Sequence, residues 1–427
     1  MKTMLTHSQT FTADQPRLGL LDRIGRRALF SRLQGLQRGR ITVLEGQERL
    51  TFGSLSTEYP LQATILVHDP RCYSEIAFGG SIGAGATYAD GHWSCDDLTA
   101  LVRIFVLNRA VLDGMEKGLA WLTTPLQRAY HRVRSNSKSG SRSNIAAHYD
   151  LGNEFFSIML DETMMYSCAF FEREDSTLFE ASIMKNDRIC KKLQLGPHDH
   201  LLEIGTGWGG FAIQAAKDYG CRVTTTTISH QQYEVAIRRI KEAGLADRIT
   251  VVMKDYRDLH ELGTTFDKLV SIEMIEAVGH AYFDTYFKSC SDLLKPEGRM
   301  LLQAITIQDQ QYERAKRSVD FIQRHIFPGS CIPSITALCT SITRATDMTL
   351  FHLEDIGVHY PATLQGWKER LASNLAQVRA LGYPESFIRL WEFYLCYCEG
   401  GFLERSISDV QMLLVKPGYR VPVRHKA

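Results

Sequence analysis

Strand-like and helical segments alternate between residues 201 and 307, and this pattern restricts the fold more than any other feature. The expected helices cover residues 209–219 and 230–243. The expected strands are residues 201–205, 221–229, 248–255, 266–274 and 298–307. Repeated strand–helix units build a parallel, doubly wound sheet. The sequence therefore predicts an α/β domain that binds its ligands at the carboxyl ends of the strands.

A glycine-rich string follows the first of these strands. Gly205, Gly207 and Gly209 come directly after Glu203 and open the next helix. Glycine allows a sharp turn and a close approach of the backbone to a ligand. A dinucleotide, S-adenosylmethionine and a purely structural turn are all compatible with such a string. The acidic residue before the first glycine favours the methyl donor. So does the second strand, which ends in threonines and not in the acid that holds a nicotinamide ribose.

The segment before residue 130 has a different pattern and predicts a small α+β domain. Residues 41–69 alternate in the way that strands do. A helix over residues 96–112 follows, with Asp96 or Asp97 near its cap. Between them lies a glycine-rich stretch, which we expect to be a loop.

This stretch, residues 78–93, contains Gly83 and Gly85 in a loose dinucleotide-like string. No strand–turn–helix unit surrounds it, so we do not predict a nucleotide site there. Residues 131–144 have four Arg or Lys, five serines and no acidic residue, which predicts a flexible linker. No aromatic residues separate these charges, which argues against nucleic-acid binding. The expected domains are therefore residues 1–130 and residues 145–427, the last third of the second being helical and forming the wall of a lipid tunnel.

The N-terminal region carries a concentration of positive charge. Seven arginines and one acidic residue, Asp22, lie between Arg17 and Arg40. Apolar side chains recur there at helical spacing: Leu20, Leu21, Ile24, Ala28, Leu29 and Leu33. A basic amphipathic helix of this kind can lie on an anionic bilayer. The alternative is a surface helix whose apolar face packs on its own domain.

Composition excludes several other classes of protein. No apolar run approaches the roughly 18 residues of a membrane span, and the first residues are too polar for a signal peptide. The ten cysteines are irregularly spaced and include no CxxC pair, so we expect neither a disulfide framework nor a metal site. These features predict a cytoplasmic protein with reduced thiols.

Around the glycine string, further motifs complete a recognisable order. They are His148-Tyr149-Asp150-Leu151-Gly152-Asn153, Met165-Tyr166-Ser167-Cys168-Ala169, Thr227-Ile228-Ser229, Asp255-Tyr256-Arg257-Asp258, Glu276-Ala277-Val278-Gly279 and Ile326-Phe327-Pro328-Gly329. With these motifs the chain resembles the cyclopropane fatty acid synthases and their mycolic acid-modifying relatives over about residues 75–415. The resemblance implies a Rossmann-like methyltransferase that uses S-adenosylmethionine.

The resemblance also assigns roles to individual residues. Positions that match donor contacts are Tyr166, Ser167, Glu203, Gly205, Gly207, Gly209, Thr227, Gln232, Tyr256 and Arg257. In the family a bound bicarbonate acts as the base, and the positions that match its ligands are Cys168, Glu276, Gln303 and Tyr360. Gln303 stands where well-known members have histidine, and Ala277 also replaces a histidine. Cys398 matches a cysteine often assigned as the active nucleophile.

The chemistry of alkene methylation is consistent with these residue types. An alkene is a weak nucleophile, so the cationic donor must be held dry and aligned. Aromatic faces can stabilise the resulting carbocation, each by about 0.5–2 kcal/mol. The candidates are Tyr149, Phe170, Phe171, Tyr312 and Tyr360. The alternatives are ordinary packing for the aromatic residues and Cys168, a solvated carboxylate for Glu276 and a hydrogen-bonded core tyrosine for Tyr360.

We therefore predict a cyclopropane-fatty-acyl-phospholipid synthase that binds peripherally to the inner membrane face, acts on unsaturated phospholipids and forms a homodimer. The nearest alternative gives a methyl-branched or methylene acyl chain without ring closure. A small-molecule methyltransferase and a non-enzymatic lipid-binding module are more distant alternatives.

Overall fold

The computed structural model describes residues 18–111 and 152–420, which form two compact units. The first unit is drawn from Met1–Val133, Arg317–Pro328 and Leu364–Ser406, and the second from Arg134–Lys316, Gly329–Thr363 and Ile407–Ala427. Residues 364–406 thus group with the N-terminal part of the chain, although the sequence had placed them in the catalytic domain. The predicted linker, residues 131–144, lies outside the described residues.

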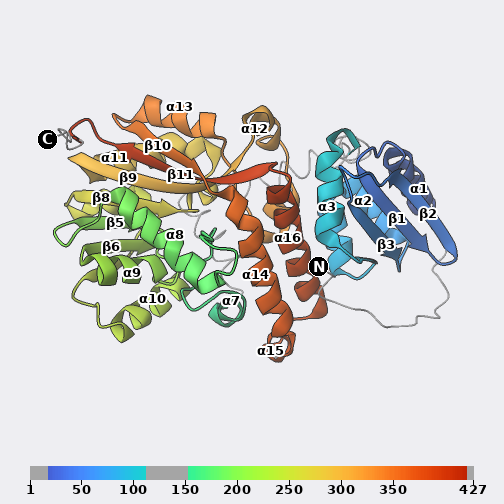
Figure 1. The fold of residues 1–427 in the computed structure, drawn as a ribbon, viewed down its shortest axis with the longest axis horizontal. Helices are drawn as coiled ribbons and strands as arrows, with labels where there is room; N and C mark the ends of the chain where they lie inside the picture. Colours follow the sequence, from blue (N-terminus) through green and yellow to red (C-terminus); the bar gives the residue numbers. More distant parts are fainter. Residues whose placement is uncertain (1–17, 112–151, 421–427) are drawn as a thin grey trace. The chain divides into compact units, whose positions relative to one another are not determined.

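The second unit contains a seven-stranded sheet of order β10-β11-β9-β8-β5-β6-β7 (Figure 1). Its strands are β5 (His200–Ile204), β6 (Arg222–Thr227), β7 (Ile249–Met253), β8 (Phe266–Ile272), β9 (Leu294–Ile307), β10 (Thr349–Asp355) and β11 (Ile407–Val415). The five predicted strands are β5 to β9, and all pairings among these five are parallel. The predicted Rossmann-like α/β fold is therefore confirmed. The strand order reverses between β5 and β8, which is where such sheets bind ligands.

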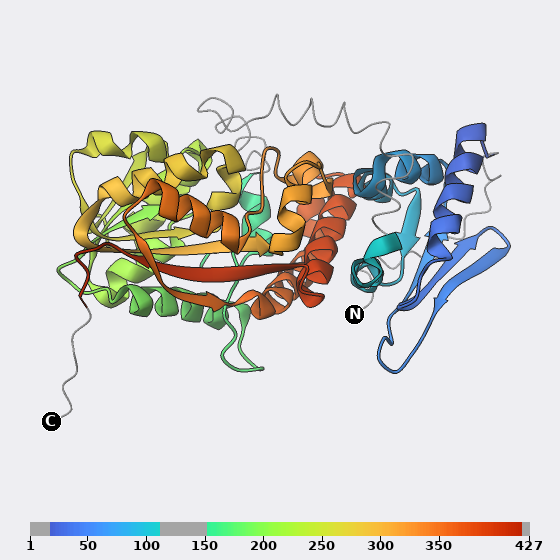
Figure 2. The ribbon, with the colours of Figure 1, turned by 90° about the horizontal axis from the view of Figure 1, so that it is seen from above.

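Helices cover both faces of this sheet, as Figures 1 and 2 show. One face packs against α8 (Leu178–Leu193), α9 (Gly210–Tyr219) and α10 (His230–Glu242). The other packs against the 3₁₀ segment η2 (Tyr256–Leu262), α11 (Phe283–Leu293) and α13 (Ile335–Ala345). Successive strand residues alternate between these two cores, since side chains of a strand point to opposite faces. Leu201 faces α8 and α9, for example, and Leu202 faces α11.

The sequence had predicted that the last third of the chain is helical, but it also contains strands. Its helices are α12 (Asp309–Ala315), α13, α14 (Tyr360–Ser373), α15 (Leu375–Ala380) and α16 (Glu385–Leu403). However, β10 and β11 are strands, and β11 pairs antiparallel with both β9 and β10. The helical prediction was wrong there: residues 409–415 of β11 are buried on both faces of the strand. A short segment that is buried on both faces is difficult to tell from a buried helix by its pattern.

The first unit contains a four-stranded sheet of order β2-β1-β3-β4. Its strands are β1 (Gly39–Glu45), β2 (Glu48–Ser54), β3 (Gln62–Val67) and β4 (Trp93–Cys95), and its helices include α1 (Leu20–Leu33), α2 (Arg71–Ala89), α3 (Leu98–Leu107) and α16. The α+β prediction is confirmed for this part. Asp97 caps α3, accepting a hydrogen bond from the backbone N–H of Ala100 at 2.8 Å.

The glycine-rich stretch at 78–93 was predicted as a loop, and this prediction was wrong. It lies largely within α2, which has one break, at Gly80 (φ 57°). The neighbouring glycines serve close packing. A Cβ atom at Gly85 would lie 2.2 Å from the ring of Phe321, and one at Gly25 of α1 would lie 2.6 Å from the carbonyl oxygen of Tyr73 in α2. Glycine is needed here because of close helix contacts, so its presence did not indicate a turn.

Helix α1 confirms the predicted basic amphipathic helix and divides its apolar residues into two groups. Leu29 and Leu33 are buried within the first unit, whereas Leu20 and Leu21 are 68% and 60% exposed. The exposed arginines lie on the same helix as the exposed leucines. No helix in the described part of the chain is long and apolar enough to cross a membrane.

Candidate donor and catalytic site

The glycine string forms a tight loop between β5 and α9. Gly205, Gly207 and Gly209 have φ values of 104°, 51° and 84°, which residues other than glycine rarely adopt. The backbone N–H groups of Gly205 and Thr206 donate to the carbonyl oxygen of Thr226 at 3.0 and 2.9 Å, which anchors the loop to β6. A Cβ atom at Gly207 would meet no heavy atom within 4 Å. The loop is thus fixed at its base and open at Gly207.

The segment that precedes Tyr166 packs against this loop. A Cβ atom at Gly210 would lie 2.3 Å from the carbonyl oxygen of Thr163. The guanidinium of Arg239 donates to the carbonyl oxygens of Glu162, Thr163 and Trp208. One side chain of α10 therefore joins the glycine loop to residues 162–163.

The predicted donor contacts Tyr166 and Ser167 follow directly. The Tyr166 ring lies 5.3 Å from the ring of Phe156, which in turn lies 5.0 Å from Trp208 in the glycine loop. Ser167 is buried, and its hydroxyl accepts a hydrogen bond from Nζ of Lys185 at 3.0 Å. The ring contacts connect Tyr166 to the glycine loop, and the hydrogen bond connects Ser167 to α8.

The remaining donor candidates lie after the next two strands. The Thr227 hydroxyl, at the end of β6, donates to Oε1 of Gln232 at 3.0 Å. Tyr256 and Arg257 open η2 after β7, and Arg257 pairs with Asp255 at 2.7 Å. All four residues therefore lie at or just beyond the carboxyl edge of the sheet, where the sequence predicted them.

Glu203 lies beneath the glycine loop. It is buried, and its Oε2 atom accepts a hydrogen bond from the Thr225 hydroxyl at 2.6 Å. Burial raises the pKa of Glu203 to about 8. The hydrogen bond of Glu203 is therefore to β6. Its role as a ligand of the methyl donor stays a prediction.

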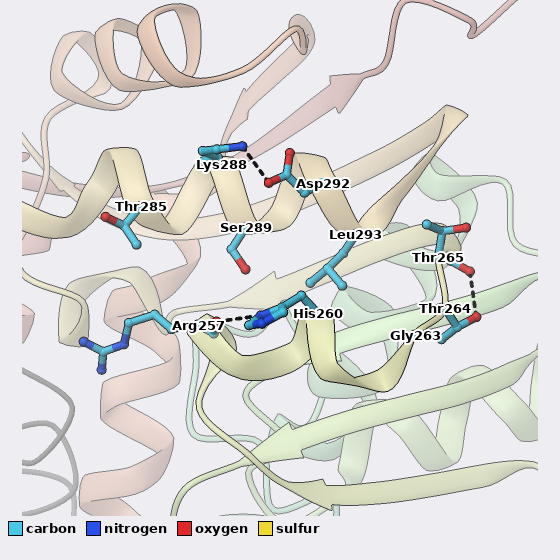
Figure 3. A pocket seen from close by; sticks show the side chains of 10 residues that line it. All are labelled: Arg257, His260, Gly263, Thr264, Thr265, Thr285, Lys288, Ser289, Asp292 and Leu293. Carbon is cyan, nitrogen blue, oxygen red and sulfur yellow. Dashed lines mark hydrogen bonds and ion pairs between the residues drawn. The ribbon is translucent and has the colours of Figure 1, made fainter.

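A surface groove of about 640 Å³ lies between η2 and α11 (Figure 3). Of the predicted site residues only Arg257 lines it, and the guanidinium points away from the other lining side chains. The lining includes Lys288 and Asp292, which form an ion pair at 2.7 Å. The groove contains no residue of the glycine loop, so we do not assign it to the donor.

A cluster of three carboxyl groups, Glu273, Glu276 and Asp409, lies at the adjoining end of β8, β9 and β11. Only Glu276 had been predicted. Its Oε1 atom accepts a hydrogen bond from the backbone N–H of Ile305 at 2.6 Å, and its Oε2 atom is buried without a hydrogen-bond partner. Burial, with a contribution from Glu273, raises the pKa of Glu276 to about 8. Glu276 is therefore not a solvated loop carboxylate.

Glu273 is the centre of the carboxylate cluster. Its Oε1 atom accepts hydrogen bonds from the backbone N–H of Cys168 and from Nε2 of Gln303, both at 2.8 Å. Its Oε2 atom accepts from the Tyr360 hydroxyl at 2.7 Å. Nε2 of Gln303 also donates to Oδ2 of Asp409 at 2.9 Å. Three donors that are far apart in the sequence thus converge on one carboxylate.

This arrangement does not fit the predicted bicarbonate. Cys168, Gln303 and Tyr360 were the expected ligands, and each directs a hydrogen bond to Glu273 instead. A bicarbonate ion at that place would lack these donors, because Glu273 already uses them, and it would lie beside the negatively charged oxygens of a carboxylate. The three predicted residues do lie together, but in this chain they hold one of its own side chains.

The two predicted cysteines lie in different units. The Cys168 thiol is buried and donates to the carbonyl oxygen of Ala169 at 3.3 Å. Cys398 lies in α16 of the first unit. Burial raises the pKa of both thiols, which disfavours the thiolate that a nucleophile needs. Cys168 contributes to the site through its backbone N–H.

The aromatic residues predicted to stabilise a cation have different surroundings. The guanidinium of Arg188 lies 3.9 Å from the ring centroid of Phe170, and the His359 ring lies 4.1 Å from it. Tyr312 is buried, and Tyr149 lies outside the described residues. A role for these rings in stabilising a cation stays a prediction.

Sequence reasoning missed Glu273, Asp409, Gln411 and the buried Lys185 of α8. Glu273 ends an apolar strand at the ligand-binding edge, which was a usable signal. Asp409 and Gln411 lie on a strand that had been predicted as helix, so their shared face was not apparent. Lys185 is one of several basic residues in its helix, and its complete burial could not be read from the pattern.

Comparison with known proteins agrees with this geometry. The model of the mycolic acid cyclopropane synthetase family matches residues 136–412. The chain belongs to this family. A cyclopropane-fatty-acyl-phospholipid synthase of Escherichia coli is 35% identical over 88% of the chain and 94% of that protein. A tuberculostearic acid methyltransferase of Mycobacterium tuberculosis is 34% identical over 84% of each chain.

Solved structures of cyclopropane synthetase family members share the fold. The cyclopropane synthase MmaA2 of Mycobacterium tuberculosis has a TM-score of 0.59 at 31% identity, covering 64% of this chain and 98% of the other. The mycolic acid cyclopropane synthase CmaA1, complexed with SAH and CTAB, has a TM-score of 0.58 at 32% identity, with the same coverage. As a member of this family the chain is an S-adenosylmethionine-dependent methyltransferase.

Donor binding at the glycine loop can be tested with Gly207→Val. The β-branched side chain would enter the open space at Gly207, and we expect S-adenosylmethionine affinity, measured by calorimetry, to fall at least about tenfold, the equivalent of about 1.4 kcal/mol. Gly244→Val is a matched control, because Gly244 also has a positive φ, 70°, and open space around it. Equal donor affinity in both variants would contradict the assignment.

Proposed function

We propose that the chain transfers a carbon from S-adenosylmethionine to the cis double bond of an unsaturated phospholipid acyl chain, closing a cyclopropane ring. The main support is the adjacency of two features. The glycine loop ends β5, the carboxylate cluster begins where β8 ends, and β5 and β8 are paired strands. A donor at the loop would therefore lie close to groups that can accept a proton.

The reaction requires two steps that this chain's residues can support. The alkene π electrons form a bond to the methyl carbon of the donor, whose C–S bond breaks, and a carbocation remains on the acyl chain. A base then removes a proton from the transferred methyl group, and the C–H electron pair closes the ring. The carboxylate cluster supplies both negative charge near the cation and proton acceptors.

The second candidate product is a methylated alkene. It forms if the carbocation loses a proton from a neighbouring chain carbon instead of from the methyl group. The similarity to a tuberculostearic acid methyltransferase supports this candidate, as does Gln303 in place of histidine. Both products add one CH₂ unit per double bond, so mass alone does not distinguish them.

The proposed function is tested by incubating the protein with labelled S-adenosylmethionine and vesicles that contain unsaturated phospholipid. We expect label in the acyl chains, and fragmentation of the product lipids to reveal a cyclopropane. A methylene or branched methyl group would select the second candidate. Labelled small molecules with unlabelled lipid would contradict a lipid substrate, and absence of any transfer would favour a binding module.

Glu276 is expected to contribute to turnover and not to donor binding. Glu276→Gln keeps the shape and removes an ionisable carboxyl group beside Glu273, so turnover should fall on the order of 100-fold. Donor affinity, measured by calorimetry, should stay unchanged, since the predicted donor contacts of the sheet follow the earlier strands β5, β6 and β7. Glu242→Gln, at an exposed position of α10, is the control. Turnover at the wild-type level in Glu276→Gln would remove this residue from the mechanism.

Peripheral membrane binding on the cytoplasmic side is proposed from α1. Arg23, Arg27 and Arg32 are exposed on it beside Leu20 and Leu21. Each arginine contributes about 1 kcal/mol near an anionic surface at low salt, so replacing all three by glutamine should weaken vesicle binding on the order of 100-fold.

Vesicle sedimentation measures this effect, and binding should weaken as salt rises. A variant with Arg222→Gln and Arg238→Gln, which changes exposed arginines of the second unit, should sediment like the wild type. Equal binding to neutral and anionic vesicles would reject the electrostatic contribution. Self-association into a homodimer, expected from the sequence, stays a prediction.

A further inference from the structure

We propose that Glu273 is the proton-accepting base of this enzyme, a side-chain carboxylate in the place where the family's bicarbonate was expected. This inference rests on the proposed function, because it concerns the proton that the methylated acyl chain must lose. Glu273 would take that proton on a carboxylate oxygen, becoming neutral, and return it to water after the product leaves. No external base is then consumed.

The first argument is the set of donors around Glu273. A backbone N–H, a carboxamide and a phenol hold its two oxygens at 2.7–2.8 Å. Hydrogen bonds of this kind hold a carboxylate in one orientation and would hold a bicarbonate equally well. Since each of these donors is already used, the chain has replaced a diffusible anion with a tethered one.

The second argument is that the orientation of Gln303 is fixed. Its Oε1 atom accepts a hydrogen bond from Nε2 of Gln411 at 3.0 Å, and Oε1 of Gln411 accepts from Nζ of Lys192 at 2.6 Å. An ammonium group can only donate, so Lys192 determines which end of Gln411 faces it. Gln411 then determines which end of Gln303 faces the carboxylates. The amide nitrogen of Gln303 must therefore point to Glu273.

The third argument is accessibility within the carboxylate cluster. Gln303 and Asp409 have no exposed surface, whereas Glu273 and Glu276 retain some. Asp409 therefore cannot reach a substrate. Burial, with contributions from the neighbouring Glu273 and Glu276, raises the pKa of Asp409 well above its ordinary value, which disfavours its ionised form. Of these two residues, Glu273 combines partial exposure with three hydrogen-bond donors, whereas the Oε2 atom of Glu276 is buried without a partner.

The fourth argument concerns the backbone conformation of Glu273 and the surroundings of its carboxyl group. Glu273 has a φ of 48°, a left-handed conformation that is strained for a residue other than glycine. This turn directs the side chain back toward the cluster, where it gains three donors. Burial raises the pKa of Glu273, and its three hydrogen-bond donors and the nearby Lys185 oppose that rise. A carboxylate with a raised pKa that is held in place is suited to act as a base near neutral pH.

Two substitutions distinguish between Glu273 and bicarbonate as the proton-accepting base. Glu273→Gln keeps the volume and removes the base, so turnover should fall at least about 100-fold, and added bicarbonate should not restore it. Glu273→Gly empties the place and suits the positive φ, so this variant should fold. Its turnover should be equally low without bicarbonate and should rise with bicarbonate concentration. Wild-type turnover should be the same in carbonate-free buffer and with added bicarbonate.

Binding of ¹³C-labelled bicarbonate, followed by NMR, tests the inference without any lipid reaction. We expect saturable binding to Glu273→Gly and none to the wild type. Gln194→Gly is the matched control, because Gln194 also has a positive φ, 52°, but lies exposed at the end of α8. It should behave like the wild type in both assays.

The possible failures are distinguishable. Bicarbonate binding to the wild type, bicarbonate-dependent wild-type turnover, or full turnover in Glu273→Gln would each overturn the role of Glu273. If no label reaches lipid from the wild-type protein, the proposed function fails. The ¹³C measurement then still decides whether Glu273 occupies the bicarbonate position.

Discussion

The reversal of strand order between β5 and β8 is the constraint on which the rest of the second unit depends. The chain leaves β5 toward β6 and β7 on one side, and later returns to place β8 and β9 on the other. The carboxyl ends of β5 and β8 are therefore neighbours with connections that diverge, which leaves space between them. The glycine loop occupies one side of this space and the carboxylate cluster the other. A different strand order would separate the two.

A second constraint is electrostatic. Several carboxyl groups and a lysine lie buried near one another, and burying charge is costly unless partners compensate. Here Lys185 is completely buried, its pKa is lowered to about 8 by burial, and Glu273 acts against that change. The polar side chains of β9 and β11 lie on the face that packs against α8, the helix that supplies Lys185 and Lys192. Part of the interior is thus polar, organised by amides and hydroxyls that connect the charged groups.

The sequence was sufficient for much of the fold and for less of the site. The alternation between residues 201 and 307 predicted β5 to β9 because strands and helices there have clear periods and glycine punctuation. The glycine loop and its neighbours followed from the same pattern. Strand β11 was missed because it is buried on both faces, and with it Asp409 and Gln411. The glycines in α2 were interpreted as a loop, because a close contact between helices and a turn of the backbone both require glycine.

Glu273 shows a different limit. Its three donors come from residues 168, 303 and 360, which no local pattern connects. Its φ value is a property of the folded chain, so the sequence gives no direct sign that the side chain turns back. The resemblance directed attention to Glu276, three residues later. From the sequence, Gln303 was only an isolated difference from the family's histidine. In the structure, Gln303 and Glu273 form one hydrogen-bonded pair.

The division of the chain between two units has a consequence for how the protein is made. The second unit acquires its sixth and seventh strands only after residue 349, and β11 follows the long excursion of residues 364–406 into the first unit. Asp409 and Gln411, which hydrogen-bond to Gln303, are therefore translated after Glu273, Gln303 and Tyr360. A nascent chain can therefore form its glycine loop early, while the carboxylate cluster stays incomplete until residues 409–411 have been translated.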